Sequence, residues 1–253
     1  MNQASPSQAR SWVDRTPTRW FYFLAAVLFL LISAASFAPS AADRSHALAP
    51  FTWLIIAHGI SVVLWLIVLI VQTFLIQTRS VLLHRRVGTA AMLLAAIVIV
   101  LGYAAAVAML RRGFDISGDL GGRMTPAKEA AGFLFPVLDI TEFGLLVIAG
   151  YFARFRGAAH KRLMLFATVA MLPAPFAHLV GHNPTLGANP AIMLALILAS
   201  VLISAVYDLI RFRRIHPLSL GLGLGLFIVD LLCATVVGPS AAWQAIAAFI
   251  AAV

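Results

Sequence analysis

The amino-acid sequence predicts an all-α fold, a polytopic transmembrane helical bundle with seven spans and a short C-terminal interfacial helix. The 253-residue chain is 62% hydrophobic and only 11% charged, whereas soluble domains are roughly 45–50% apolar and about 25% charged. Its mean hydropathy is +0.98, and its apolar residues are gathered in long runs separated by short polar segments. A chain of this composition needs the bilayer as the solvent for most of its length.

Seven apolar runs are long enough to cross a bilayer, because a spanning helix needs about 20 residues. They lie near Trp20–Ala38, Phe51–Ile76, Gly88–Leu110, Ala131–Ala153, Leu163–Val180, Pro190–Ile210 and Leu218–Val237. We expect a transmembrane domain over residues 20–237, preceded by a cytoplasmic tail over residues 1–19. An alternative interpretation of the first run is a cleaved signal peptide, since small residues follow it.

The C-terminal segment, residues 238–253, is predicted to form a short interfacial or half-inserted helix. Only thirteen residues follow Gly238-Pro239-Ser240, which is too few to cross comfortably. The preceding run contains GLGLGLF at 221–227. This segment lacks the spacing of a dinucleotide-binding loop and instead favours close packing between helices.

The distribution of lysine and arginine predicts the orientation. Thirteen of these residues fall on the side of the N-terminus and five on the other side. Basic residues collect in cytoplasmic loops, so we expect a bacterial inner-membrane protein with a cytoplasmic N-terminus and a periplasmic C-terminus. The same rule accounts for the net charge of +9 without a nucleic-acid partner, and membrane lipids are the expected surroundings. The single cysteine, Cys233, excludes an intrachain disulfide.

The three predicted cytoplasmic hairpin loops resemble one another. They read TRSVLLHRRVG, RFRGAAHKRLM and RFRRIHPLSLG. Their shared basic and histidine residues are His84, Arg85, Arg86, His160, Lys161, Arg162, Arg214 and His216. Recurrence of basic residues in cytoplasmic loops explains this pattern; a duplicated helical hairpin, or loops that hold an acidic lipid headgroup or a phosphate, are the alternatives. Asp208 lies one turn from Arg211, and we expect these two residues to pair.

Five ionisable side chains lie well inside the predicted spans. Each costs about 2.5–3.5 kcal/mol to insert into a bilayer and therefore needs an explanation. They are His58, Asp139, Glu142, His178 and Asp230. At about 1.5 Å per residue, all five fall in the outer half of the membrane. We therefore predict that they line one polar pocket that opens toward the periplasm, with Trp65, Gln72 and Tyr103 also lining it.

A divalent-metal site is one interpretation of this pocket. His178 and His182 are four residues apart and share a helix face, and with His58 they would supply three ligands to zinc. Asp139, Glu142 and Asp230 would act as further ligands or as a general base. Zinc-bound water attacks esters and amides. The layout is similar to that of the transmembrane hydrolase group containing alkaline ceramidases and adiponectin-receptor-like proteins, which implies a lipid amide or ester as substrate.

Three other interpretations remain open. A b-type haem would use His58 and His178 as axial ligands, with basic residues near its propionates. A proton- or cation-coupled transporter would use the buried acids, because membrane carboxylates relay protons and bind cations. A structural or assembly subunit would use the polar groups only for hydrogen bonds between helices.

The chain also resembles a group of uncharacterised bacterial multi-pass inner-membrane proteins. The resemblance rests on LIQTRSVLLHRRVGTAAMLLA, HKRLMLFATVAMLP and YDLIRFRRIHP. It covers roughly Phe51 to Val237. It implies a helical inner-membrane fold, with no established activity, substrate or site residue.

Overall fold

The computed structural model describes residues 20–120, 124–187 and 189–253. The predicted tail over residues 1–19 lies outside this part of the chain. The described residues form helices and no strands, and seven helical segments are long and apolar enough to cross a membrane. The predicted all-α transmembrane bundle is thereby confirmed.

The helices follow the apolar runs closely. In chain order they are α1 (Phe21–Ala42), α2 (Trp53–Gln77), α3 (Val81–Arg112), α4 (Pro126–Phe152), α5 (Gly157–Val169), α6 (Pro173–Gly181), α7 (Pro184–Gly187), α8 (Pro190–Phe212), α9 (Pro217–Leu232), the π-helix Cys233–Val237 and α10 (Ala241–Ala252). The fifth span consists of α5 and α6 together.

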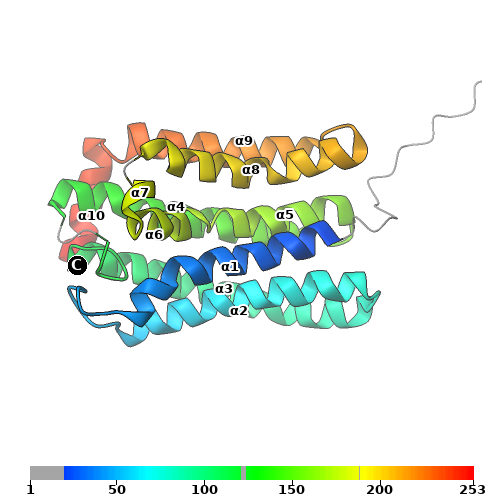
Figure 1. Ribbon diagram of the computed structural model, residues 1–253, viewed down its shortest axis with the longest axis horizontal. Helices are drawn as coiled ribbons and strands as arrows, with labels where there is room; N and C mark the ends of the chain where they lie inside the picture. The colour runs from blue at the N-terminus through cyan, green and yellow to red at the C-terminus, as the bar shows by residue number, and fades with distance from the viewer. Residues whose placement is uncertain (1–19, 121–123, 188) are drawn as a thin grey trace, which may run out of the picture.

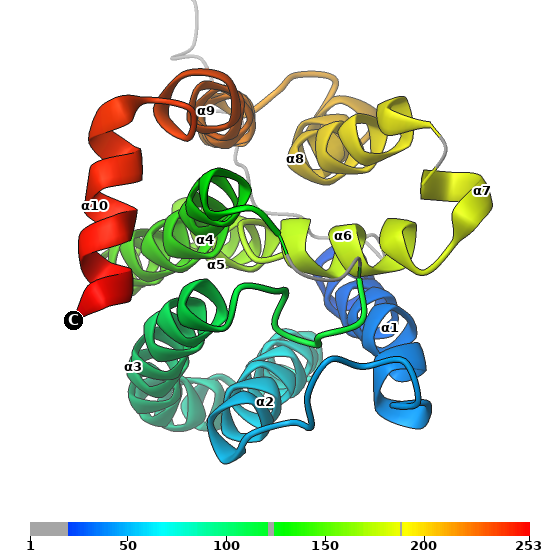
Figure 2. The ribbon, with the colours of Figure 1, turned by 90° about the vertical axis from the view of Figure 1, so that its left-hand side faces the viewer.

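The bundle has three layers. Figures 1 and 2 show α8 and α9 on one side, α4, α5 and α6 in the middle, and α1, α2 and α3 on the other side. The middle layer supplies much of the core, including Phe143, Phe166 and Ala167, which are fully buried. Outward-facing leucines and isoleucines remain exposed, as expected where lipid is the solvent.

The two ends of the bundle differ in charge. The basic end carries the α2–α3, α4–α5 and α8–α9 connections and lies on the right in Figure 1. The histidine end carries the α1–α2 and α3–α4 connections, α6 and α10. Of the described lysine and arginine residues, ten lie at the basic end and four at the histidine end. This asymmetry supports the predicted orientation, which stays a prediction.

The fifth span breaks before Pro173. α5 ends at Val169, and α6 begins at Pro173 after a short turn. Proline has no N–H for the helical ladder and its ring clashes with the preceding turn. Figure 2 shows that α6 runs across the histidine end instead of along the bundle. The break turns a part of the predicted span sideways and brings the histidines over the other helices.

The basic end contains a fully buried ion pair. Arg162 on α5 and Asp208 on α8 are both 0% exposed and form a salt bridge. Nε of Arg162 also donates to the hydroxyl of Ser219 on α9 at 2.8 Å. Asp208 is therefore paired with Arg162, which the sequence did not predict, and Arg162 is a helix residue and not a loop residue. α5 already begins at Gly157, which places Arg162 on the inner face of its second turn.

The C-terminal helix packs against the bundle. The indole N–H of Trp243 donates to the main-chain oxygen of Ala130 at 2.6 Å, and its ring stacks on Phe133. α10 contacts both α3 and α4. Its placement at the membrane interface stays a prediction.

Candidate metal centre

His178 and His182 lie side by side at the end of α6. Nδ1 of His182 is 2.9 Å from the main-chain oxygen of His178, and the two rings are 5.8 Å apart and nearly parallel. A carbonyl oxygen only accepts, so Nδ1 carries the proton and donates. This fixes the ring and turns Nε2 of His182 toward the α3–α4 connection. A carbonyl in this role is the usual orienting partner of a metal-binding histidine.

Asp119 completes the cluster from the α3–α4 connection. Its Oδ2 lies 3.4 Å from Nε2 of His182. Ligand atoms of Asp119, His178 and His182 all lie within 4.8 Å of one another. The cluster joins a loop to a helix some sixty residues further along the chain, and Figure 2 shows that loop passing directly beside α6.

The loop before Asp119 is held by local hydrogen bonds. Gly113 ends α3 in the left-handed conformation, with a φ of 76° that glycine adopts without strain. The carboxylate of Asp115 then accepts from the amides of Ser117, Gly118 and Leu120. The hydroxyl of Ser117 contacts the carboxylates of both Asp115 and Asp119. These hydrogen bonds fix the position of Asp119, although the loop itself has no regular secondary structure.

The last turn of α1 and the connection that follows it supply two further groups. The hydroxyl of Ser40 donates to Asp119 Oδ1 at 3.2 Å and lies 3.3 Å from Nε2 of His182. Nη1 of Arg44 lies 3.9 Å from Asp119 Oδ2. Partial burial raises the pKa of Asp119, but hydrogen bonds from Ser117, Ser40 and His182 outweigh it, so the pKa lies below its usual value. Asp119 is therefore a carboxylate at neutral pH.

The nitrogen of His182 that faces the Asp119 carboxylate is placed to bind a cation. Nδ1 of His182 already donates to a carbonyl, so Nε2 faces the Asp119 carboxylate with either a lone pair or a second proton. A lone pair facing a carboxylate is repulsive unless a cation lies between them or a donor such as the Ser40 hydroxyl bonds to one of them. His178 is only 4% exposed, and its Nδ1 has no hydrogen-bond partner among the described residues. A metal ion or an imidazolium would resolve this arrangement.

His58, the third predicted ligand, lies elsewhere. Its ring is next to Gly102 on α3 and close to Ile140 on α4, and it is not a member of the cluster formed by the described residues. Nδ1 of His58 is buried and has no partner in that part of the chain. The structure therefore gives His58 and His178 different neighbours.

The three predicted acids, of which Asp139 and Glu142 are buried and Asp230 is half-buried, interact with one another. Asp139 on α4 interacts electrostatically with Glu142 and with Asp230 on α9, and Cys233 interacts with Glu142 and Asp230. Asp139 is 6% exposed, and its Oδ1 has no hydrogen-bond partner among the described residues. In contrast, His178 interacts with Asp115, Asp119 and His182. The acids on α4 and α9 and the histidines on α6 thus have different charged neighbours.

The three predicted pocket-lining residues have separate surroundings. Trp65 is a core residue that donates to the Thr168 hydroxyl at 3.2 Å. Gln72 lies near the basic end, against Gly88. The hydroxyl of Tyr103 lies 2.7 Å from that of Thr141, and Tyr103 lines a surface groove on α3. None of them lines the cluster at His178.

Two histidines of the basic loops, His84 and His160, lie within hydrogen-bond distance of main-chain oxygens in the preceding helix. Nδ1 of His160 lies 2.8 Å from the main-chain oxygen of Gly150, and Nδ1 of His84 lies 3.3 Å from that of Gln72. His216 differs, because its Nδ1 accepts from Leu218 N and caps α9. Arg85 and Arg86 are exposed, whereas Lys161 and Arg214 are half-buried. Hydrogen bonding within hairpins explains part of the loop similarity.

Sequence reasoning missed Asp119 and Ser40, and it considered Arg44 only as a basic residue near the haem propionates. The available signal is the segment FDISGD, in which two aspartates and a serine alternate at the end of α3. Such residues form turns through their own side chains, but the pattern carries no information on which helix the turn contacts. No protein-family model, no curated protein and no solved structure matches this chain.

Proposed function

We propose that the protein is an integral membrane protein that binds a divalent transition metal, with zinc as the best match, through Asp119, His178 and His182. The observation that carries this proposal is the approach of three ligand atoms to within 4.8 Å of one another. The ligands are two imidazoles and a carboxylate, which are groups that zinc prefers. Zinc at about 2.0–2.1 Å from each ligand separates neighbouring ligand atoms by roughly 3.4 Å in a tetrahedron. The distance of 3.4 Å between His182 Nε2 and Asp119 Oδ2 fits this geometry.

Three protein ligands favour a catalytic or transport site over a structural one. Structural zinc sites use four protein ligands, whereas catalytic sites use three and keep one position for water. When bound, zinc would supply a Lewis acid and a water of pKa about 7. Ser40 and Ser117 hold the Asp119 carboxylate in place, and Arg44 adds a positive charge at 3.9 Å from it. These groups suit hydrolysis of an ester or amide of a lipid.

Metal analysis of the purified protein tests the site. We expect about one zinc per chain in the wild type and a loss of at least ten-fold in affinity in His182→Ala and Asp119→Asn. His46→Ala is the matched control, because His46 is an exposed histidine in the α1–α2 connection at the same end. Equal zinc content in wild type and both variants, or the absence of zinc from a folded wild type incubated with the ion, would overturn the proposal.

Hydrolysis is tested separately with short-chain lipid esters and amides. Release of fatty acid that requires zinc and is lost in Asp119→Asn would support it. A zinc-loaded protein that hydrolyses none of these substrates would leave a binding or transport role for the same site.

Proton or cation movement through the buried acids is a second candidate function. The specific observation is Asp139, which is buried beside two further carboxyl groups and has an oxygen without a hydrogen-bond partner among the described residues. Charged groups inside a membrane are costly and usually lie on ion pathways. pH-driven flux in proteoliposomes should be lost in Asp139→Asn and retained in His182→Ala. Equal flux in empty and protein-containing vesicles would exclude this candidate.

A further inference from the structure

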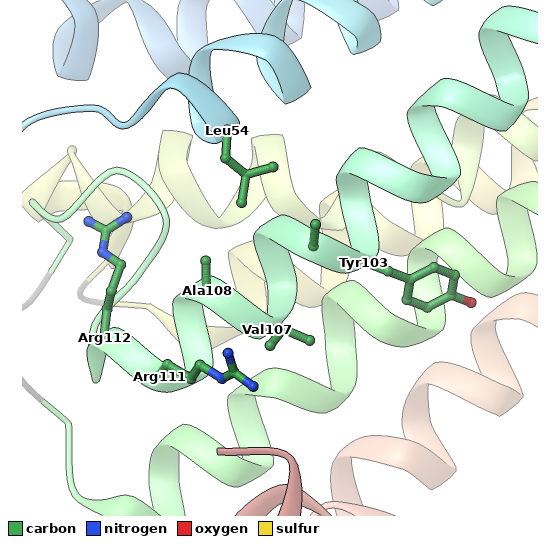
Figure 3. A pocket seen from close by; sticks show the side chains of 7 residues that line it. Leu54, Tyr103, Val107, Ala108, Arg111 and Arg112 are labelled. Carbon is green, nitrogen blue, oxygen red and sulfur yellow. The ribbon is translucent and has the colours of Figure 1, made fainter. Parts of the chain in front are cut away.

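A surface groove runs along α3 toward the histidine end, away from the residues of the metal centre. It has a volume of about 610 Å³ and is open along one side. Leu54 at the start of α2 forms one wall, and residues between Tyr103 and Arg112 on α3 form the rest. Figure 3 shows the two arginines at one end of the groove and Tyr103 at the other.

The groove changes from apolar to basic along its length. Its middle is lined by Val107 and Ala108, and the small alanine leaves room beside the helix. Arg111 and Arg112 follow in the last turn of α3. The helix rises about 1.5 Å per residue, so Tyr103 and Arg111 are separated by about 12 Å along the axis. An apolar trough of this length that ends in positive charge is complementary to an acyl chain joined to a phosphate.

The guanidinium of Arg111 can bind such a phosphate. Arg111 is exposed, and one of its N–H groups donates to the main-chain oxygen of Ile250 at 3.3 Å. Within the described part of the chain, no carboxylate forms a salt bridge with Arg111. Arginine has five N–H donors in a planar fork that matches phosphate oxygens. Four donors therefore remain for a ligand.

The acidic side chains near this end of the groove contact groups other than Arg111. Asp115 interacts with Arg112, but its carboxylate also accepts from three loop amides. The guanidinium of Arg112 lies over the Phe114 ring at 4.3 Å. Glu129 lies against Gly113. The groove itself is lined by two arginines and by no acid.

We propose that this groove binds an anionic phospholipid, with the phosphate on Arg111 and the first part of one acyl chain along Val107 and Ala108. The groove shares no lining residue with the metal centre. Arginines in the last turn also complement the dipole of α3. That role alone would change stability without lipid selectivity, so the two roles can be separated by experiment.

Lipid binding to the detergent-purified protein, measured by native mass spectrometry, tests this site. We expect the wild type to retain phosphatidylglycerol in preference to phosphatidylcholine. Arg111→Gln should weaken phosphatidylglycerol binding by about ten-fold, which corresponds to the loss of a charge-assisted hydrogen bond, and should leave phosphatidylcholine unchanged. Ala108→Trp, which fills the trough, should also reduce retention of phosphatidylglycerol.

Arg154→Gln is the matched control. Arg154 is exposed at the basic end, donates to the Tyr151 main-chain oxygen at 3.1 Å and lies outside the groove. Its substitution should leave lipid binding unchanged. Equal retention of both lipids, unchanged phosphatidylglycerol binding in Arg111→Gln with a wild-type melting temperature, or displacement of the lipid by millimolar inorganic phosphate would each overturn the proposal. The last result would indicate a site for the free anion.

Discussion

The main-chain oxygen of His178 accepts a hydrogen bond from Nδ1 of His182 at 2.9 Å. This contact uses the only proton of a neutral His182 imidazole, so the nitrogen that faces Asp119 has none. That nitrogen lies 3.4 Å from the Asp119 carboxylate and 3.3 Å from the Ser40 hydroxyl. A nitrogen that faces a carboxylate in this way is placed to share a metal ion with it, which is the central chemical feature of this end of the bundle.

Zinc binding should therefore release protons. A metal ion binds an imidazole nitrogen only when that nitrogen carries no proton, so metal binding to histidine ligands competes with protons. Titration calorimetry in two buffers of different ionisation enthalpy measures the release. We expect more protons released at pH 5.5 than at pH 8. A release that is the same in His182→Ala and in wild type would contradict this prediction.

The melting temperature of the protein should fall at low pH because Asp119 becomes protonated. Folding lowers the pKa of Asp119, so the folded state favours the carboxylate. This stabilisation is complete above the usual aspartate pKa of about 3.9 and is lost as the pH falls through the lower folded-state value. The melting temperature of the wild type should fall more than that of Asp119→Asn between pH 5 and pH 3. Parallel curves for the two proteins would show that Asp119 is not responsible.

The buried pair of Arg162 and Asp208 should be sensitive to single changes and tolerant of a double change. Arg162→Met leaves the Asp208 carboxylate buried without its partner, which costs about 3–5 kcal/mol. The double variant Arg162→Met with Asp208→Leu removes both charges and should recover most of that loss. Unfolding in mixed micelles measures the free energies. Arg156→Met, at an exposed position of the same connection, should have little effect.

A double variant no more stable than Arg162→Met alone would contradict this account. Ser219 would then be the more important partner, because it contacts both Arg162 and Asp208.

Hydropathy predicted the spans because each helix must bury a long apolar segment in lipid, whatever its neighbours are. α2 and α4 lie within a few residues of the predicted runs, and α4 continues through Pro136. The depth of His58 was also read from the sequence. The direction in which His58 faces could not be read from the sequence. Successive residues point about 100° apart around the helix axis, so each direction leads to a different neighbouring helix. Hydropathy does not show which neighbour lies on that side.

Contacts between distant segments were the part that the sequence could not supply. Asp119 meets His182 only because Pro173 turns α6 across the end of the bundle and Asp115 folds the α3–α4 loop toward it. Pro173 and Asp115 can each be recognised in the sequence as residues that break or turn the chain. Whether the two segments then meet depends on how α1, α3 and α6 pack. Arg162 shows the same limit, since a basic residue near a loop is usually exposed, and only the partner on α8 explains its burial.

Of Gly221, Gly223 and Gly225 on α9, only Gly223 should be sensitive to substitution by alanine, because only Gly223 packs against α8. A Cβ at Gly223 would lie 2.3 Å from the main-chain oxygen of Val201 on α8, so α8 and α9 can approach this closely only with glycine there. Gly223→Ala should destabilise the protein by about 1–3 kcal/mol. Gly221→Ala and Gly225→Ala are matched controls, because a Cβ at either position meets no other atom within 4 Å, and each should be neutral or stabilising by up to about 1 kcal/mol. Unfolding of the three variants in the same micelles makes the comparison, and equal effects at all three positions would show that helix propensity, and not the α8–α9 contact, determines the result.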